Sequence, residues 1–160
     1  MSDVLSPESR SKNMRAIRGK NTHPELLLRK LLFGRGFRFR LHVKTMPGKP
    51  DIVLPKYLVA ILVHGCFWHG HECYLFKLPI SRRDFWRTKI AQNRMRDIRD
   101  TDALLQSGWR VLCVWECALK GKLRWDHDEL CDQISRWILC GGEHEKYSEI
   151  QCLSERKNIF

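Results

Sequence analysis

Apolar and polar positions along the chain predict three helices with recognisable ends. The first begins at a capping box, with Thr22 as N-cap and Glu25 at the third helical position. Its leucine-rich turns are expected to end near residues 34–36, where glycines stand. Two further helices are expected over residues 82–107 and 126–139, and glycines follow both of them.

Four shorter segments have the patterns of strands. Residues 37–43 alternate apolar and basic side chains, as a half-buried strand does. Short turns lead from this segment to two apolar runs, at residues 51–54 and 57–63, so the three are expected to form an antiparallel meander. A fourth strand is expected at residues 109–115. This element order is that of the α/β core of restriction-endonuclease-like nucleases, and it predicts a mixed central sheet flanked by helices.

At 160 residues the chain is most simply a single globular core with two flanking segments. Residues 1–21 form a basic N-terminal segment, in which Met14 and Ile17 are spaced like one face of a short helix. Residues 22–142 contain all the predicted elements of an endonuclease domain. Residues 143–160 form a polar C-terminal tail that we expect to be loosely held.

The formal net charge of +11 indicates a polyanionic partner. Nucleic acid is the leading candidate, because lysine and arginine contacts to phosphates supply most non-specific affinity for DNA. The sequence has no signal-peptide pattern, no basic amphipathic anchor and no apolar run long enough to cross a bilayer. We therefore expect a cytoplasmic protein that acts on nucleic acid and not on a membrane.

Seven cysteines, an odd number, in a chain without an export signal argue against a disulfide framework. Reduced thiols are instead available to bind metal. Cys113, Cys131 and Cys140 lie in apolar strand or helix patterns and are interpreted as small core residues.

A candidate hydrolytic site lies where two predicted strands meet. Asp51 opens one strand, and His64 and His69 follow the end of the next. A carboxylate can hold Mg²⁺ together with carbonyl and phosphate oxygens, and a neutral imidazole can take a proton from an attacking water. We predict that Asp51 binds the metal, that His69 is the general base, and that His64 contacts the scissile phosphate or a water on the metal. For each residue alone, a turn-capping or structural role is the competing interpretation.

A second cluster of ligand types overlaps the same loop. Cys66, His71 and Cys73 lie within eight residues of one another, and Cys117 follows the last predicted strand. Thiolates and imidazole favour Zn²⁺, and four protein ligands would make a closed, structural site. The spacing is not that of a standard zinc finger, so buried thiols with a surface histidine are the alternative.

Aromatic residues on the loop and at the start of the long helix predict a DNA-facing surface. Phe67, Trp68 and Trp86 are flanked by several arginines and lysines. Large side chains that enter a base stack cost unstacking energy, and that cost is lower where the duplex is already mismatched. Three other tryptophans are interpreted as core residues, namely Trp109, Trp115 and Trp137.

Several strings together resemble the very-short-patch mismatch repair endonucleases, the Vsr family. The most specific is His64-Gly65-Cys66-Phe67-Trp68-His69, and the resemblance covers nearly the whole chain to about Trp137. Other matching strings lie at residues 10–17, 47–51, 73–77 and 108–119.

The resemblance implies a Mg²⁺-dependent nick in double-stranded DNA, 5′ to the thymine of a T·G mismatch. Such mismatches arise when 5-methylcytosine deaminates, so a functional link to a cytosine-5 DNA methyltransferase is implied. Contact with general mismatch-repair factors follows from family analogy alone. A bacterial, nucleoid-associated location and a monomer are expected, since one active site suffices for a nick.

The resemblance also assigns roles to residues. It makes Asp51 and the Val63 backbone carbonyl the Mg²⁺ ligands and His69 the base, supported by His64 and Glu25. Asp97 is expected to orient His69 because of its place on the helix predicted over residues 82–107. It makes Cys66, His71, Cys73 and Cys117 the ligands of a structural zinc. The residues that it places on DNA are Met14, Ile17, Phe67, Trp68, Trp86, Lys89 and Asn93.

One departure from the wider nuclease superfamily stands out. The Glu-x-Lys element of that superfamily has no counterpart here, because the strand ends in Leu62-Val63-His64. The general base must therefore be a histidine. Two rival functions are a zinc-stabilised DNA-binding module without turnover and a restriction-type enzyme that cuts both strands of an intact site.

Overall fold

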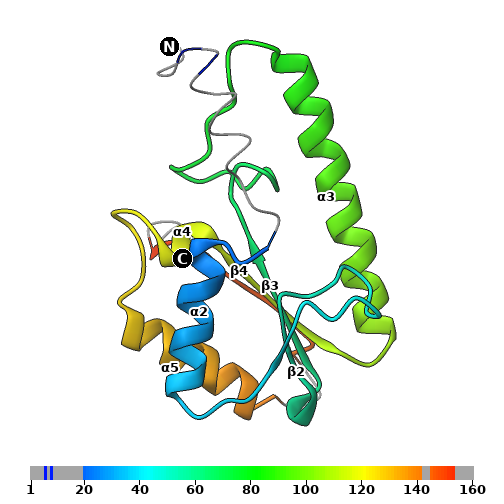
Figure 1. Cartoon of the computed structure of the whole chain (residues 1–160), viewed down its shortest axis with the longest axis vertical. Coiled ribbons are helices and arrows are strands. Elements are labelled where there is room, and N and C mark those ends of the chain that lie inside the picture. The colour runs from blue at the N-terminus through cyan, green and yellow to red at the C-terminus, as the bar shows by residue number, and fades with distance from the viewer. Residues whose placement is uncertain (1–5, 7, 9–19, 142–144, 154–160) are drawn as a thin grey trace.

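A five-stranded mixed sheet forms the centre of the computed structural model, which describes residues 6, 8, 20–141 and 145–153 (Figure 1). The strands follow one another in sequence order across the sheet. Met14 and Ile17 lie outside the described residues. The strands are β1 (Arg40–Leu41), β2 (Ile52–Leu54), β3 (Val59–His64), β4 (Arg110–Trp115) and β5 (Tyr147–Ile150).

The predicted antiparallel meander is confirmed. Strand β2 pairs antiparallel with both β1 and β3, and Ile52 faces Ile61 in the register of the second pair. Strand β4 then pairs parallel with β3, which requires a long crossover connection, and α3 (Arg83–Gln106) provides it. The first strand is shorter than predicted, two residues in place of seven, and it ends just before His42, which has a φ of 48°.

Strand β5 was missed by the sequence analysis, which expected four strands and a polar tail from residue 143. Tyr147–Ile150 adds to β4 as a parallel strand, with Val111 facing Tyr147 and Val114 facing Ile150. Of its four residues only Ile150 is buried, so its sequence lacks the apolar alternation that identifies a strand. Pairing with β4 therefore decides its conformation.

Helices lie on both faces of the sheet. Figure 1 shows α2 (His23–Gly34) and α5 (His127–Leu139) together on one side and the long α3 on the other. The 24 residues of α3 span about 36 Å at 1.5 Å per residue, so its first half extends beyond the sheet. Two short helical segments complete the fold, the 3₁₀ helix Pro55–Tyr57 and α4 (Glu116–Leu119).

The core is divided between the two faces of β3 and β4. Ile61 packs with Leu32 of α2 and Ile134 of α5, whereas its neighbour Leu62 packs with Leu104 of α3. This alternation follows from the period of two in a strand. Complete burial of one such side chain contributes about 1.5–3 kcal/mol to the free energy of unfolding. These buried contacts therefore hold a helix layer on each face of the sheet.

Most of the predicted core cysteines and tryptophans are confirmed. Cys113 and Cys131 are buried, and Trp115 and Trp137 are each less than one-tenth exposed. The prediction for Cys140 is wrong, because this residue follows the last turn of α5 and is exposed.

Helix caps also differ from the sequence prediction at one end of α2. Asp126 caps α5, since its side chain accepts from the backbone N–H groups of Asp128 and Glu129. At α2 the side chain of Thr22 makes no bond to a backbone N–H, and Glu25 reaches back one residue further, to the N–H of Asn21. The described residues include no helix that is both long and apolar enough to cross a membrane.

Candidate active site

Asp51 lies immediately before β2 and is held against the end of β3. Its backbone N–H donates to the carbonyl of Ile61 at 3.1 Å, and its Oδ2 accepts from the backbone N–H of Val63 at 2.7 Å. Burial, with a smaller contribution from the nearby Glu25 carboxylate, raises the pKa of Asp51 to about 7, although the Val63 bond, Arg29 and His69 oppose this rise. A divalent cation would favour the charged form, so the carboxyl group is suited to metal binding.

Glu25 is a buried carboxylate in the first turn of α2, with 3% of its surface exposed. It accepts from the N–H of Asn21 at 3.0 Å, from Thr22 Oγ1 at 3.2 Å and from Arg29 Nη2 at 3.1 Å. Three donors therefore hold the carboxylate in one orientation.

His42 completes a group that we call the carboxylate cluster: Glu25, His42 and Asp51. One potential ligand atom from each residue lies within 4.8 Å of the others. The sequence analysis assigned a role to both acids and none to His42, because no motif surrounds this histidine. Its place after β1, in a backbone conformation with a φ of 48°, brings it beside α2.

His64 and His69, which we call the histidine pair, stack on each other with ring centroids 3.9 Å apart and an angle of 3° between the rings. His69 Nδ1 lies 2.5 Å from Asp97 Oδ2 on α3, so this nitrogen donates to the carboxylate and Nε2 is left as the proton acceptor. The hydrogen bond between His69 and Asp97 agrees with the orienting role expected for Asp97. Burial lowers the pKa of His64 to about 3, and His69 contributes in the same direction. His64 is therefore neutral at physiological pH.

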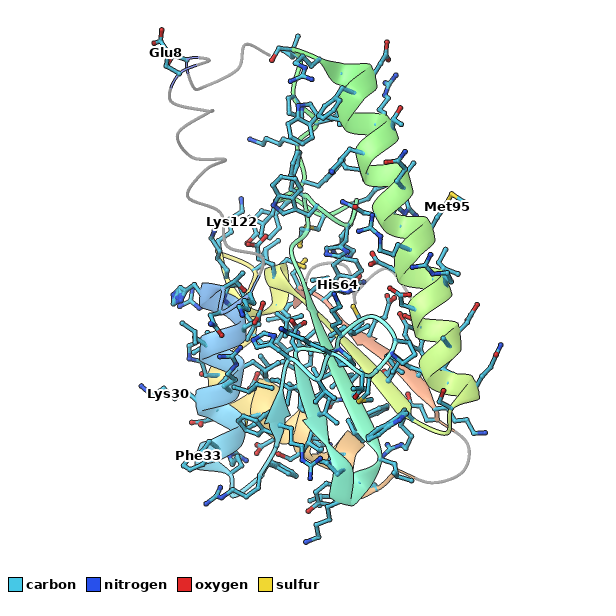
Figure 2. All side chains as sticks on the ribbon, turned by 45° about the vertical axis from the view of Figure 1, so that its right-hand side comes forward. Glu8, Lys30, Phe33, His64, Met95 and Lys122 are labelled. Atoms are coloured by element: carbon cyan, nitrogen blue, oxygen red, sulfur yellow. The ribbon has the colours of Figure 1, made fainter. Side chains whose placement is uncertain are left out.

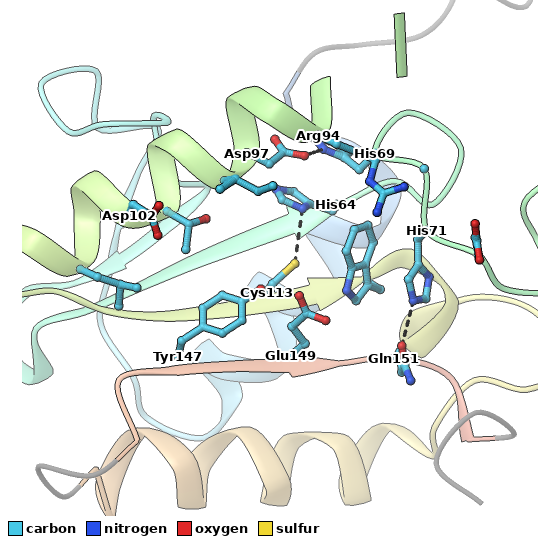
Figure 3. Close-up of a pocket in the computed structure, with 16 residues that line it drawn as sticks. His64, His69, His71, Arg94, Asp97, Asp102, Cys113, Tyr147, Glu149 and Gln151 are labelled. Carbon is cyan, nitrogen blue, oxygen red and sulfur yellow. Dashed lines mark hydrogen bonds and ion pairs between the residues drawn. The ribbon is translucent and has the colours of Figure 1, made fainter. Parts of the chain in front are cut away.

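A cleft of about 650 Å³ opens beside the histidine pair. Figure 3 shows that His64, His69 and Asp97 lie along one side, while Tyr147 and Glu149 of β5 lie on the other. The lining residues do not include Asp51 or Glu25. None of the three residues of the carboxylate cluster lines this cleft, but His69 is near enough to lower the pKa of Asp51. His64 lies on the side of the sheet that faces α3 (Figure 2).

The four predicted zinc ligands lie close together. We call them the cysteine cluster: Cys66, His71, Cys73 and Cys117. Their potential ligand atoms all lie within 4.8 Å of one another. His71 Nε2 is 2.8 Å from Gln151 Oε1, so Nε2 donates and Nδ1 presents its lone pair to the cluster, 3.7 Å from Cys117 Sγ. The residue set and its spacing fit a tetrahedral metal site.

Two residues of the C-terminal segment support this cluster, and the sequence analysis missed both. Gln151 orients His71, and the backbone N–H of Cys152 donates to Cys117 Sγ at 3.3 Å. They follow β5, so pairing of an unpredicted strand places them.

The pKa values of the thiols in the cluster also favour a bound cation. A hydrogen bond from Cys117 lowers the pKa of Cys66 to about 4, while burial and the Cys66 charge raise the pKa of Cys73 to about 11. One thiolate therefore forms without help, and the others need a positive charge to ionise.

The aromatic residues of the loop pack on the start of α3. Phe67, Trp68 and Trp86 are mutually in edge contact, with ring centroids 5.2–5.8 Å apart. Trp86 is only 7% exposed, whereas Phe67 and Trp68 are half-buried. In this arrangement Trp86 lies behind the other two rings.

The loop is also fixed by α3 through polar contacts and a close approach. Asn93 Nδ2 donates to the backbone carbonyl of Trp68 at 2.9 Å, while Lys89 is exposed on the same helix. At Gly70, which has a φ of 63°, an added Cβ would lie 2.6 Å from Ile90 Cγ2. The absence of a side chain lets the loop lie directly against the helix.

Comparison with known proteins gives consistent matches. The family model for "DNA mismatch endonuclease Vsr" matches residues 2–75. The DNA mismatch endonuclease Vsr of Escherichia coli is 48% identical over 141 residues, 88% of this chain and 90% of that protein. The type II nicking enzyme V.XorIIP of Xanthomonas oryzae is 54% identical over 119 residues, 74% of this chain and 88% of the enzyme. A similar enzyme of Neisseria meningitidis, V.NmeAIP, is 48% identical over 122 residues, 76% of this chain and 87% of the enzyme. With such identity over most of its length, this chain belongs to the Vsr family of endonucleases, whose core is restriction-endonuclease-like.

Proposed function

We propose that this protein is a mismatch repair endonuclease that nicks double-stranded DNA 5′ to the thymine of a T·G mismatch, by Mg²⁺-dependent hydrolysis. The arrangement that carries the proposal is the His69–Asp97 pair beside a buried carboxylate, Asp51, whose pKa is raised to about 7. A module that only binds DNA needs neither a buried acid nor an oriented imidazole near phosphates.

In this proposal Asp51 and the backbone carbonyl of Val63 hold Mg²⁺, with Glu25 supporting the waters around it. Bound Mg²⁺ would supply Lewis-acid stabilisation of the charge that develops on the phosphate. His69 takes the proton of the attacking water at Nε2, and Asp97 stabilises the imidazolium that results. His64 stays neutral, so it does not repel the proton that His69 receives.

The cysteine cluster is proposed to hold a structural Zn²⁺. It joins the loop of residues 66–73 to α4 through Cys117, and it thereby fixes the segment that contains His69. All four ligand positions come from protein, so this site has no place for substrate.

DNA recognition is proposed to use the aromatic group and α3. Phe67 and Trp68, supported from behind by Trp86, would enter the stack beside the mismatch, and Lys89 and Asn93 would contact the mismatched pair. Because Asn93 also holds the Trp68 backbone, it would couple mismatch contact to the loop position. Met14 and Ile17 are proposed as the minor-groove counterpart.

A nick fits the comparisons better than a double-strand cut, since several relatives are themselves named type II nicking enzymes. The proposal includes a functional link to a cytosine-5 DNA methyltransferase, possible contact with mismatch-repair factors by analogy, action as a monomer, and a bacterial cytoplasmic location at the nucleoid.

The proposal is tested with end-labelled duplexes that carry T·G or fully paired C·G at one cytosine-methylation site, with Mg²⁺ or EDTA. A single Mg²⁺-dependent cut 5′ to the mismatched thymine supports the repair function. Cutting of both strands in the paired duplex would support a restriction enzyme, and binding without cleavage over a series of flanking sequences would support a DNA-binding module.

A further inference from the structure

The register of the two central strands brings Cys113 beside His64. Strands β3 and β4 are parallel, and Cys113 of β4 pairs with Leu62, two residues before His64 on β3. Paired residues, and residues two apart on one strand, share a face of the sheet. Because Leu62 packs with Leu104 of α3, His64 and Cys113 point to that side as well. Figure 3 shows the resulting contact, in which Cys113 Sγ lies 3.3 Å from His64 Nδ1.

The thiol of Cys113 is the donor in this contact. Cys113 is 2% exposed, and burial raises the pKa of its thiol, with the nearby Glu149 and Asp97 acting in the same direction. The sulfur therefore keeps its hydrogen. A thiol sulfur is a weak acceptor, whereas the bare nitrogen of a neutral imidazole offers a lone pair. The hydrogen bond thus runs from Cys113 Sγ to His64 Nδ1.

His64 is the neutral ring of the histidine pair. The two rings stack with centroids 3.9 Å apart, a distance at which two cations would repel each other strongly. His69 has the carboxylate of Asp97 as its partner, whereas the thiol of Cys113 is the one hydrogen-bond partner of His64 in the described part of the chain. A positive charge is therefore stabilised on His69 and not on His64. In a neutral His64 whose Nδ1 accepts, the single hydrogen is on Nε2.

The two stacked rings thereby present opposite groups. Nδ1 of His69 donates to Asp97 and leaves Nε2 as an acceptor, while Nδ1 of His64 accepts from Cys113 and leaves Nε2 as a donor. Among the described residues, His64 Nε2 is not one of the buried side-chain nitrogens that lack a partner, so it is open to a ligand. An N–H group beside a water-activating imidazole suits a phosphate oxygen, which accepts and does not donate.

We infer that Cys113 is a positioning residue: its thiol holds His64 in the tautomer with hydrogen on Nε2, so that His64 donates to the scissile phosphate. This rests on the proposed function, which puts a phosphate beside the histidine pair. Cys113 lies 49 residues from His64 and on another strand, outside the motif that contains the histidine. A residue with a place in the core thus also acts on the site.

The tautomer of His64 is read by long-range ¹H–¹⁵N correlation spectroscopy on the zinc-loaded, full-length protein with ¹⁵N-labelled histidine, at slightly alkaline pH and without DNA or Mg²⁺. His64→Gln assigns the resonances. We expect the hydrogen on Nε2 in the wild type, and an Nδ1 resonance displaced from that of a nitrogen with a free lone pair. Cys113→Val removes the donor at similar size and should return this resonance toward the free value. Cys113→Ser keeps a donor and should keep the displacement.

Cys131→Val is the matched control. Cys131 is also a buried thiol, and it donates to the backbone carbonyl of Leu31 at 3.4 Å, on the face of the sheet away from α3. Loss of one hydrogen bond predicts that Cys113→Val lowers the single-turnover nicking rate by about three- to tenfold. Cys113→Ser should lie between Cys113→Val and the wild type, and Cys131→Val should nick at the wild-type rate even if its Tm falls.

The outcomes separate the role of Cys113 from the proposed function. Hydrogen on Nδ1 of His64 in the wild type overturns the inference, even in a protein that nicks T·G duplexes. A Cys113 that only fills the core would lower Tm in Cys113→Val and leave the His64 resonances and the nicking rate of the folded protein unchanged, and this also overturns it. The expected resonances in a protein that does not nick mismatched DNA overturn the proposed function, but they support the hold of Cys113 on His64.

Discussion

The cysteine cluster and the histidine pair share the loop that follows β3, yet opposite tasks are proposed for them. His71 and His69 are two residues apart in sequence, and each has one ring nitrogen fixed by a side-chain oxygen. The partner of His71 is the neutral amide of Gln151, and its other nitrogen faces thiols. The partner of His69 is the carboxylate of Asp97, and His69 lines the cleft.

From this difference we infer that partners from distant elements decide what each histidine can do. An amide partner with soft neighbours makes an imidazole a metal ligand. A carboxylate partner beside a cleft makes it a base, because the imidazolium is stabilised and the second nitrogen is accessible. The following experiments test this division, from the largest expected effect to the smallest.

Removal of metal from the cysteine cluster should have the largest effect. A closed structural site contributes directly to folding, so stripping by chelator, or Cys73→Ser, should lower Tm by about 20 °C or more. Calorimetry with metal analysis measures this. Cys140→Ser is the control, because that thiol is exposed and outside the cluster. An unchanged Tm after verified metal removal would contradict a structural metal.

Asp51→Ala should abolish nicking, by about 10³-fold or more, without loss of mismatch binding. The carboxylate is proposed to hold Mg²⁺ and not to contact the DNA framework. Single-turnover cleavage and fluorescence anisotropy on the same T·G duplex measure the two properties. Retained turnover would exclude the proposed role of Asp51.

Asp97→Asn should reduce the nicking rate by about 10²-fold to 10⁴-fold, the range of a general base, and leave Tm nearly unchanged. The amide neither stabilises the imidazolium of His69 nor enforces the same tautomer. Asp102→Asn, one turn and one residue further along α3, is the matched control. Equal effects of the two substitutions would mean that general charge on α3, and not the contact with His69, is responsible.

Gln151→Ala should weaken metal affinity of the cysteine cluster by about 10-fold to 100-fold, as loss of a ligand-orienting partner does. Competition with a chromogenic chelator measures this, and nicking by the metal-loaded variant should be nearly normal. A large loss of nicking at full metal occupancy would mean that Gln151 also affects the histidine pair, and it would contradict the separate tasks proposed for the two groups.

The smallest effect should be seen with Asp51→Asn in the absence of Mg²⁺. The folded pKa of Asp51 is about 7 and its ordinary value is 3.8, so the folded state binds its proton more tightly than the unfolded state. The cost of the buried charge is absent below pH 3.8, grows as pH rises toward 7, and is complete above it. We expect Asp51→Asn to raise Tm at pH 8 by a few degrees, at about 2–4 °C per kcal/mol, and by less at pH 5. A larger gain at pH 5 than at pH 8 would contradict the raised pKa.

Local patterns predicted much of this fold. Leucines with helical spacing and the apolar runs of β3 and β4 identified the main elements within a few residues. Neighbouring strands with short turns gave the meander and its antiparallel pairs. Strand β5 and the shortening of β1 were not predictable in this way, because pairing partners and backbone turns, not residue pattern, determine them.

The candidate site divides in the same manner. The sequence alone identified the cysteine cluster, Asp51 and the histidine pair, because metal-ligand and proton-transfer chemistry restricts which residue types can occur together. Tertiary structure alone decided that His42 and Arg29 join Glu25, that Gln151 orients His71, and that Trp86 lies behind Phe67 and Trp68. These contacts connect elements far apart in the chain, and only the packing of helices and loops on the sheet brings their side chains within a few ångströms.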